Sequence, residues 1–190
     1  MNLTDIEINN FNREYKIASQ EMNGIIILDN YRPKKISFFE KLRAKKVIKH
    51  FEKALEIVPE HFASLFFLGK VYQRLEEYEK ALFYFEKALE FEKENYSLPQ
   101  EASLVAMHLN KIGKAIEYSS EALNRKPNNF ALMGNHLMNL LIAGKDKEAM
   151  EQIDLALKLE PNDSVNKNIK DKIVSVANGE VKRPTFKETI

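Results

Sequence analysis

Side chains that commonly catalyse reactions or bind metal ions are scattered along this 190-residue chain. The four histidines are His50, His61, His108 and His136. None has a partner at the spacing of a metal site or a catalytic triad. The absence of cysteine excludes disulfides, thiolate metal sites and a cysteine nucleophile, and no glycine-rich phosphate loop, HExxH or G-x-S-x-G motif occurs. We therefore predict that the protein is not an enzyme and needs no cofactor or metal ion.

Glu76 and Glu77 form an adjacent pair of carboxylates, the residue type that many enzymes use for acid–base catalysis. The pair lies between two segments with helical periodicity, where a turn is expected. Solvated charge is ordinary in such a turn, so we interpret the two glutamates as surface residues.

Two stretches carry clustered charge, although the formal net charge is only +1. The basic residues between positions 32 and 53 are Arg32, Lys34, Lys35, Lys41, Arg43, Lys45, Lys46, Lys49 and Lys53, opposed by Glu40 and Glu52. Residues 76–94 hold seven glutamates and three lysines. We interpret both stretches first as solvated helix faces. The alternatives are contact of the basic stretch with an acidic partner or nucleic acid, and head-to-tail homo-oligomers that weaken as salt rises.

A period of 34 residues organises most of the chain. Alanine–leucine pairs recur at this interval, at positions 54–55, 88–89, 122–123 and 156–157. Ala81, Ala115 and Ala149 recur in the same way, as do Pro127 and Pro161. Such a period is typical of stacked helical hairpins. Within residues 78–92 the apolar positions follow three- and four-residue steps, which predicts one buried stripe on a helix.

Residues 62–95 resemble the tetratricopeptide repeat. The matching positions are Leu65, Leu68, Gly69, Tyr72, Tyr78, Ala81, Phe85 and Ala88, and Lys93 replaces the closing proline. Residues 96–129 and 130–163 keep the second half of the pattern, whereas their first halves depart from it, with Pro99 at the position of the large residue. The resemblance implies an all-α, right-handed superhelical solenoid of helix-turn-helix repeats.

We predict three helical hairpins, at about 61–75 with 78–93, 98–111 with 112–125, and 130–143 with 146–159. Residues 1–36 form an atypical N-terminal segment, a helix followed by a short extended stretch at 25–28, and residues 37–61 form a partial first repeat. Tetratricopeptide repeats follow at 62–95, 96–129 and 130–163. Residues 164–178 then form a capping helix, and residues 179–190 form a mobile tail.

In proteins of the tetratricopeptide family, the first helices of successive repeats line a concave groove that holds peptides. The corresponding positions here are Phe66, Lys70, Gln73, Arg74, Gln100, Leu104, Met107, His108, Asn135, Met138 and Leu141. This mixture suits a partner with an acidic group and hydrophobic anchors. The alternative is that Leu104, Met107 and Leu141 only cover helix packing. Phe66 and Glu101 occupy two positions of the family's clamp for chaperone C-termini, so that specificity is not expected.

These observations predict a scaffold that binds a protein or peptide in its groove. One alternative is an assembly subunit that acts through residues 1–36, and a weaker one is a nucleic-acid-binding solenoid that uses residues 32–53. No basic, then apolar leader opens the sequence, and its longest apolar run, 25–28, is too short to span a membrane. We therefore expect a cytoplasmic protein with no membrane partner.

Overall fold

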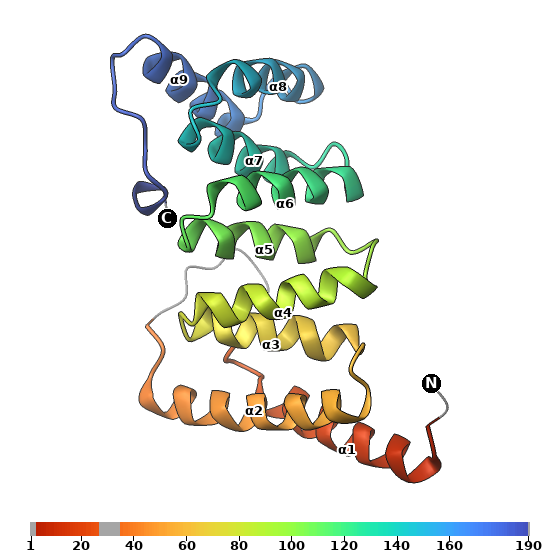
Figure 1. The fold of residues 1–190 in the computed structure, drawn as a ribbon. Helices are drawn as coiled ribbons and strands as arrows, with labels where there is room; N and C mark the ends of the chain where they lie inside the picture. The colour runs from red at the N-terminus through yellow and green to blue at the C-terminus, as the bar shows by residue number, and fades with distance from the viewer. Residues whose placement is uncertain (1–2, 27–34, 190) are drawn as a thin grey trace. The chain divides into compact units, whose positions relative to one another are not determined.

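A computed structural model describes residues 3–26 and 35–189 (Figure 1). The described residues form nine α-helices and a short 3₁₀ helix, and they contain no strand. The α-helices are α1 (Asp5–Glu21), α2 (Phe38–Ile57), α3 (Phe62–Arg74), α4 (Tyr78–Phe91), α5 (Ser97–His108), α6 (Ile112–Arg125), α7 (Phe130–Ile142), α8 (Asp146–Leu159) and α9 (Ser164–Ala177). The 3₁₀ helix is η1 (Phe186–Glu188). The all-α helical-repeat fold predicted from the sequence is confirmed.

The chain divides into two compact units, which we call unit 1, up to Lys93, and unit 2, from Glu94 onward. In unit 1, α1 packs along α2, α3 and α4 form a hairpin, and α2 also contacts α3. In unit 2, the hairpins α5/α6 and α7/α8 are joined by contacts between α6 and α7, and α9 packs against both α7 and α8. Each unit therefore contains antiparallel helical pairs that bury one face against a neighbour.

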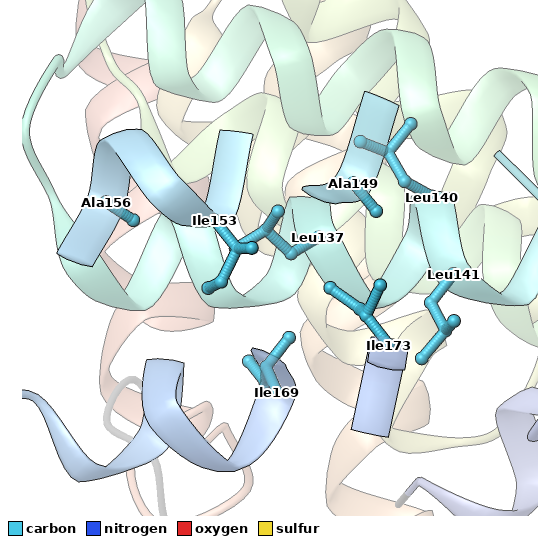
Figure 2. Packing of buried hydrophobic residues seen from close by; sticks show 8 residues of the cluster. All are labelled: Leu137, Leu140, Leu141, Ala149, Ile153, Ala156, Ile169 and Ile173. Carbon is cyan, nitrogen blue, oxygen red and sulfur yellow. The ribbon is translucent and has the colours of Figure 1, made fainter. Parts of the chain in front are cut away.

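The predicted capping helix is α9, which begins at a side-chain cap. The carboxylate of Asp163 accepts a hydrogen bond from the backbone N–H of Asn166 at 2.6 Å. Ile169 and Ile173 of this helix then pack into a core formed with α7 and α8 (Figure 2). The other members of this core are Leu137, Leu140, Leu141, Ala149, Ile153 and Ala156. The repeat alanines thus allow α8 to approach its neighbours closely.

In unit 1, a glycine and a phenylalanine define how closely the hairpin packs. A Cβ atom at Gly69 on α3 would overlap three carbons of the Phe85 ring on α4. Phe85 is fully buried. The Leu-Gly pair of the repeat pattern therefore exists because the ring of the second helix occupies the space of the missing side chain.

The hairpin turns share a backbone conformation at one repeat position. Glu76, Asn110 and Gly144 are each 34 residues apart, and their φ angles are 62°, 56° and 78°. Glu76 and Glu77 are exposed at the α3/α4 turn, as the surface interpretation of this pair predicted. A left-handed φ strains a residue with a Cβ atom, so Glu76 holds a conformation that glycine adopts at lower cost.

We expect Glu76→Gly to raise the free energy of unfolding by about 0.5–1 kcal/mol, because it removes this strain from an exposed turn. Urea unfolding followed by circular dichroism measures the change. Gly144→Ala, at the equivalent turn of α7/α8, is the matched control and should lower stability by a similar amount. A loss of stability in Glu76→Gly would contradict the prediction.

Parts of two sequence predictions lie outside the described residues. In the segment expected to be extended, Ile25 and Ile26 lie in a turn and a bend after Gly24, while residues 27 and 28 are not described. Arg32 and Lys34 of the basic stretch are also outside the description. The predicted tail, residues 179–190, is described to position 189 and contacts the α5/α6 and α7/α8 hairpins of its own unit through Arg183 and Phe186.

Candidate peptide-binding surfaces

The structure places four of the predicted groove residues on α3 of unit 1. Phe66, Lys70, Gln73 and Arg74 follow steps of four, three and one residues, which puts them on one side of the helix. The helix starts at a histidine cap, because Nδ1 of His61 accepts a hydrogen bond from the backbone N–H of Ser64 at 3.2 Å. Burial lowers the pKa of His61, which keeps this ring nitrogen available as an acceptor.

The four α3 residues expose less of their side chains to solvent than residues that line an open groove would. The Phe66 ring lies 5.8 Å from the Phe62 ring and 5.9 Å from the Phe85 ring, so it belongs to an aromatic cluster. Lys70 is only 8% exposed, whereas Gln73 and Arg74 are half-buried. The polar groups that reach the surface of this helix are therefore concentrated in its last turn.

In unit 2, the predicted groove residues separate into buried and accessible sets. Met107 on α5 and Leu141 on α7 are buried, as the packing alternative predicts for them. By contrast, Leu104 is 40% exposed. Among the remaining members, Asn135 is exposed and Gln100, His108 and Met138 are half-buried.

Buried polar contacts hold the helices of unit 2 that carry these residues. The hydroxyl of Ser103 donates to the carbonyl of Ala115 at 2.8 Å, and the amide of Asn139 donates to the Ser103 hydroxyl at 3.0 Å. The hydroxyl of Ser119 lies 2.7 Å from Nδ1 of His136. Burial lowers the pKa of His136, which favours the neutral ring in this contact. These contacts position α5 and α7 against α6.

Each of the four histidines contacts another side chain or a backbone group of its own unit. Nδ1 of His50 lies 2.6 Å from a carboxylate oxygen of Glu14, and the His108 ring meets the Phe186 ring edge-on. In the described ranges, no three histidine, aspartate or glutamate side chains are arranged to hold a metal ion.

The basic stretch on α2 is partly used inside unit 1. The Arg43 guanidinium donates to the backbone carbonyls of Glu21 and Asn23 at 2.8 Å each, and the Lys46 ammonium lies 2.7 Å from the Glu21 carboxylate. These cations meet the C-terminal end of α1, where carbonyl groups lack helical partners. Part of the charge cluster therefore fixes α1 on α2.

Sequence reasoning missed two features. One is a cleft of about 370 Å³ in unit 1, lined by Lys41, Lys45, Ile48, Tyr72, Leu75, Glu77 and Lys80. The other is the contact of Arg183 and Phe186 with unit 2. The four-residue step from Lys41 to Lys45 was a signal for the first. Nothing periodic marks the second, because it joins residues far apart in the sequence.

Antiparallel helical pairs with a 34-residue period define a helical-repeat protein. Residues 62–95 match the family model of the tetratricopeptide repeat. The resemblance is thereby confirmed: the chain carries a tetratricopeptide repeat and has the fold of tetratricopeptide proteins. The search of curated proteins gave no match, and none of the described helices has the length and apolar character to cross a bilayer.

Three solved structures with the same fold differ in their sequence identity to this chain and in their TM-score. YrrB, a tetratricopeptide protein described as having an unusual peptide-binding site, is 23% identical with a TM-score of 0.63, and the match covers 79% of this chain and 76% of YrrB. A tetratricopeptide protein from Parabacteroides merdae is 14% identical with a TM-score of 0.71, and the match covers 90% of this chain and 61% of that protein. The first repeat domain of Spaghetti (RPAP3), bound to an HSP90 peptide, is 20% identical with a TM-score of 0.55, and the match covers 62% of this chain and 93% of that domain.

Proposed function

We propose that this chain is a non-catalytic scaffold that binds a protein or peptide through the first helices of its repeats, α3, α5 and α7. The observation that carries the proposal is the accessible mixture of groups on these helices. Leu104 and Asn135 are exposed, and Gln73, Arg74 and Gln100 are half-buried. An exposed leucine on α5, an exposed asparagine on α7 and a guanidinium in the last turn of α3 are the kinds of group that hold a segment with hydrophobic anchors and polar backbone groups.

Two structures of the same fold support a peptide ligand. YrrB is described with a peptide-binding site, and the Spaghetti domain holds an HSP90 peptide. We do not propose the chaperone specificity of the latter for this chain. Phe66 and Glu101 replace two clamp residues, and Lys70 is only 8% exposed. The partner is thus expected to present mixed polar and apolar side chains.

The structure favours the assembly alternative over the nucleic-acid alternative. The assembly alternative is favoured by apolar side chains that are exposed in or near the N-terminal segment. Ile6 is 74% exposed and Phe39 is 76% exposed. The nucleic-acid alternative is weaker, because Arg43 and Lys46 are engaged with Glu21. Salt-sensitive self-association remains a prediction, which sedimentation at low and high salt tests. The cytoplasmic location also remains a prediction from the sequence.

A matched pair of leucine variants tests the proposed surface. Affinity capture from the native host should recover at least about tenfold less partner with Leu104→Asp, because a charge replaces an apolar anchor on α5. Leu155→Asp is the control, since Leu155 is 55% exposed on α8, a second helix. Equal recovery by wild type and Leu104→Asp would refute the groove assignment.

A further inference from the structure

The C-terminal segment of unit 2 lies back against the hairpins α5/α6 and α7/α8 (Figure 1). After α9 the chain turns at Gly179, whose φ is 74°, and continues to η1. Its contacts come from an arginine and from an aromatic ring three residues later. Such a pair of anchors is typical of a short linear segment seated on a domain surface.

Arg183 supplies the first anchor. Its guanidinium nitrogens lie 2.6 and 2.7 Å from the two carboxylate oxygens of Asp146, and one of them also donates to the carbonyl of Leu141. The guanidinium lowers the pKa of Asp146. A Cβ at Gly144 would stand 3.8 Å from the guanidinium carbon, so the α7/α8 turn fits closely beside the arginine. Asp146 and the turn therefore bind the planar guanidinium through two parallel hydrogen bonds to the carboxylate and one to the backbone.

Phe186 supplies the second anchor. Its ring is half-buried and lies 4.8 Å from the His108 ring in an edge-on arrangement. It packs against the cluster of Ala106, Met107 and Ala115, as Ile112, Tyr118 and Ile142 also do. Pro184, between the two anchors, is buried as well. Both anchors thus contact the hairpins of unit 2.

The segment supplies part of its own structure. The Glu188 carboxylate accepts hydrogen bonds from the backbone N–H and the hydroxyl of Thr185 at 2.6 and 2.8 Å, and the Thr189 hydroxyl donates to the carbonyl of Phe186 at 2.7 Å. These bonds lie within the segment and support η1 in addition to the packing of Phe186. The segment is therefore preorganised to present its arginine and its ring.

We propose that Met107, His108, Ile112, Ile142 and Asp146 form a second peptide site, the tail site, which takes segments with an arginine followed three residues later by an aromatic ring. The chain's own tail is its resident occupant, and an external segment with the same pair of groups competes with it. The inference shares with the proposed function the idea that unit 2 holds peptides, and Met107 and His108 are also among the groove positions predicted from the sequence. The tail site lies at the hairpin turns and uses different side chains from Leu104 and Asn135.

The solvent exposure of the arginine anchor indicates that the occupant exchanges. The side chains of Arg183 and Asp146 are 35% and 29% exposed, so water reaches their ion pair and limits its strength. Against exchange, the tail is tethered by only a few residues to α9, which gives it an effective concentration on the order of millimolar. An external segment must overcome this intramolecular competitor, and its apparent affinity falls by the fraction of molecules with the tail in place.

Fluorescence anisotropy with a labelled peptide of residues 180–190 tests the proposal on the full chain. The variant Arg183→Ala/Phe186→Ala releases the tail and should bind the labelled peptide at least about tenfold more tightly than wild type does. A labelled peptide with the same two substitutions should not bind. Adding Asp146→Asn to the released variant should weaken binding at least about tenfold, whereas Asp171→Asn, on the exposed side of α9, should leave it unchanged.

Two results would overturn the tail site. One is a folded, released variant that binds the native and the substituted peptides equally; the other is equal binding of the native peptide by wild type and the released variant. Circular dichroism establishes folding, and a chain ending at residue 179 serves as the second released form. Adding Leu104→Asp to the released variant should not change tail-peptide binding. Failure of the tail site and failure of the proposed groove therefore give different results.

Discussion

Replacing Phe85 by alanine should lower the free energy of unfolding by about 3–5 kcal/mol, because the change empties the centre of the α3/α4 hairpin. The ring is fully buried, lies against Gly69 where that residue lacks a side chain, and approaches the Phe66 ring at 5.9 Å. Urea unfolding measured by circular dichroism gives the value.

The matched control is the same substitution two residues earlier on the same helix. Phe83 is 50% exposed, and its ring contacts the Lys87 ammonium. We expect Phe83→Ala to cost less than about 1 kcal/mol. Similar losses in the two variants would show that the hairpin does not depend on the Gly69–Phe85 contact.

The second large effect concerns the buried carboxylate–histidine contact that joins α1 to α2. Glu14 is 5% exposed, and its carboxylate contacts Nδ1 of His50 at 2.6 Å and the Arg13 guanidinium at 2.9 Å. Glu14→Ala leaves His50 without this partner, so we expect a loss of about 1.5–3 kcal/mol near neutral pH. Glu56→Ala, at an exposed position of α2, should change stability by less than about 0.5 kcal/mol.

The same pair predicts a pH dependence with a definite sign. The hydrogen bond with His50 holds the pKa of Glu14 below its ordinary value of 4.5, and Arg13 acts in the same direction against the effect of burial. The folded-state pKa is thus the lower one. The stabilisation is complete above pH 4.5 and is lost as the pH falls through that lower pKa. The stability difference between wild type and Glu14→Ala should shrink in acid; a constant difference would contradict this.

The sequence predicted the helices because their limits depend on local chemistry. The predicted spans 112–125 and 146–159 match α6 and α8, and the prediction of 61–75 differs from α3 by one residue at each end. The repeat alanines mark the buried stripe, and the prolines mark where a helix cannot continue. Both signals lie within a single hairpin, so they are readable without knowledge of the neighbours.

The accessibility of the candidate site could not be read in the same way. Family positions put Lys70, Met107 and Leu141 on a groove, yet all three are buried. Periodicity identifies the face of a helix, whereas burial depends on how far the neighbouring elements extend over it. The same reason explains the charge cluster on α2, where only the structure shows that Arg43 and Lys46 contact Glu21.

Long-range contacts were the least predictable feature. Arg183 meets Asp146 across 37 positions, and Glu14 meets His50 across 36. The sequence from 179 onward is polar, and a mobile tail was the natural expectation for it. Its attachment depends on two side chains whose partners lie on the turns of other hairpins, and no short-range pattern records that pairing.

The position of cross-links to a captured partner tests the binding surface most directly. A photoreactive amino acid placed at Asn135 on α7 should yield covalent adducts with the partner protein. The same group at Lys158, exposed on α8, should yield none. Adducts from Lys158 together with no adduct from Asn135 would contradict binding through the first helices of the repeats.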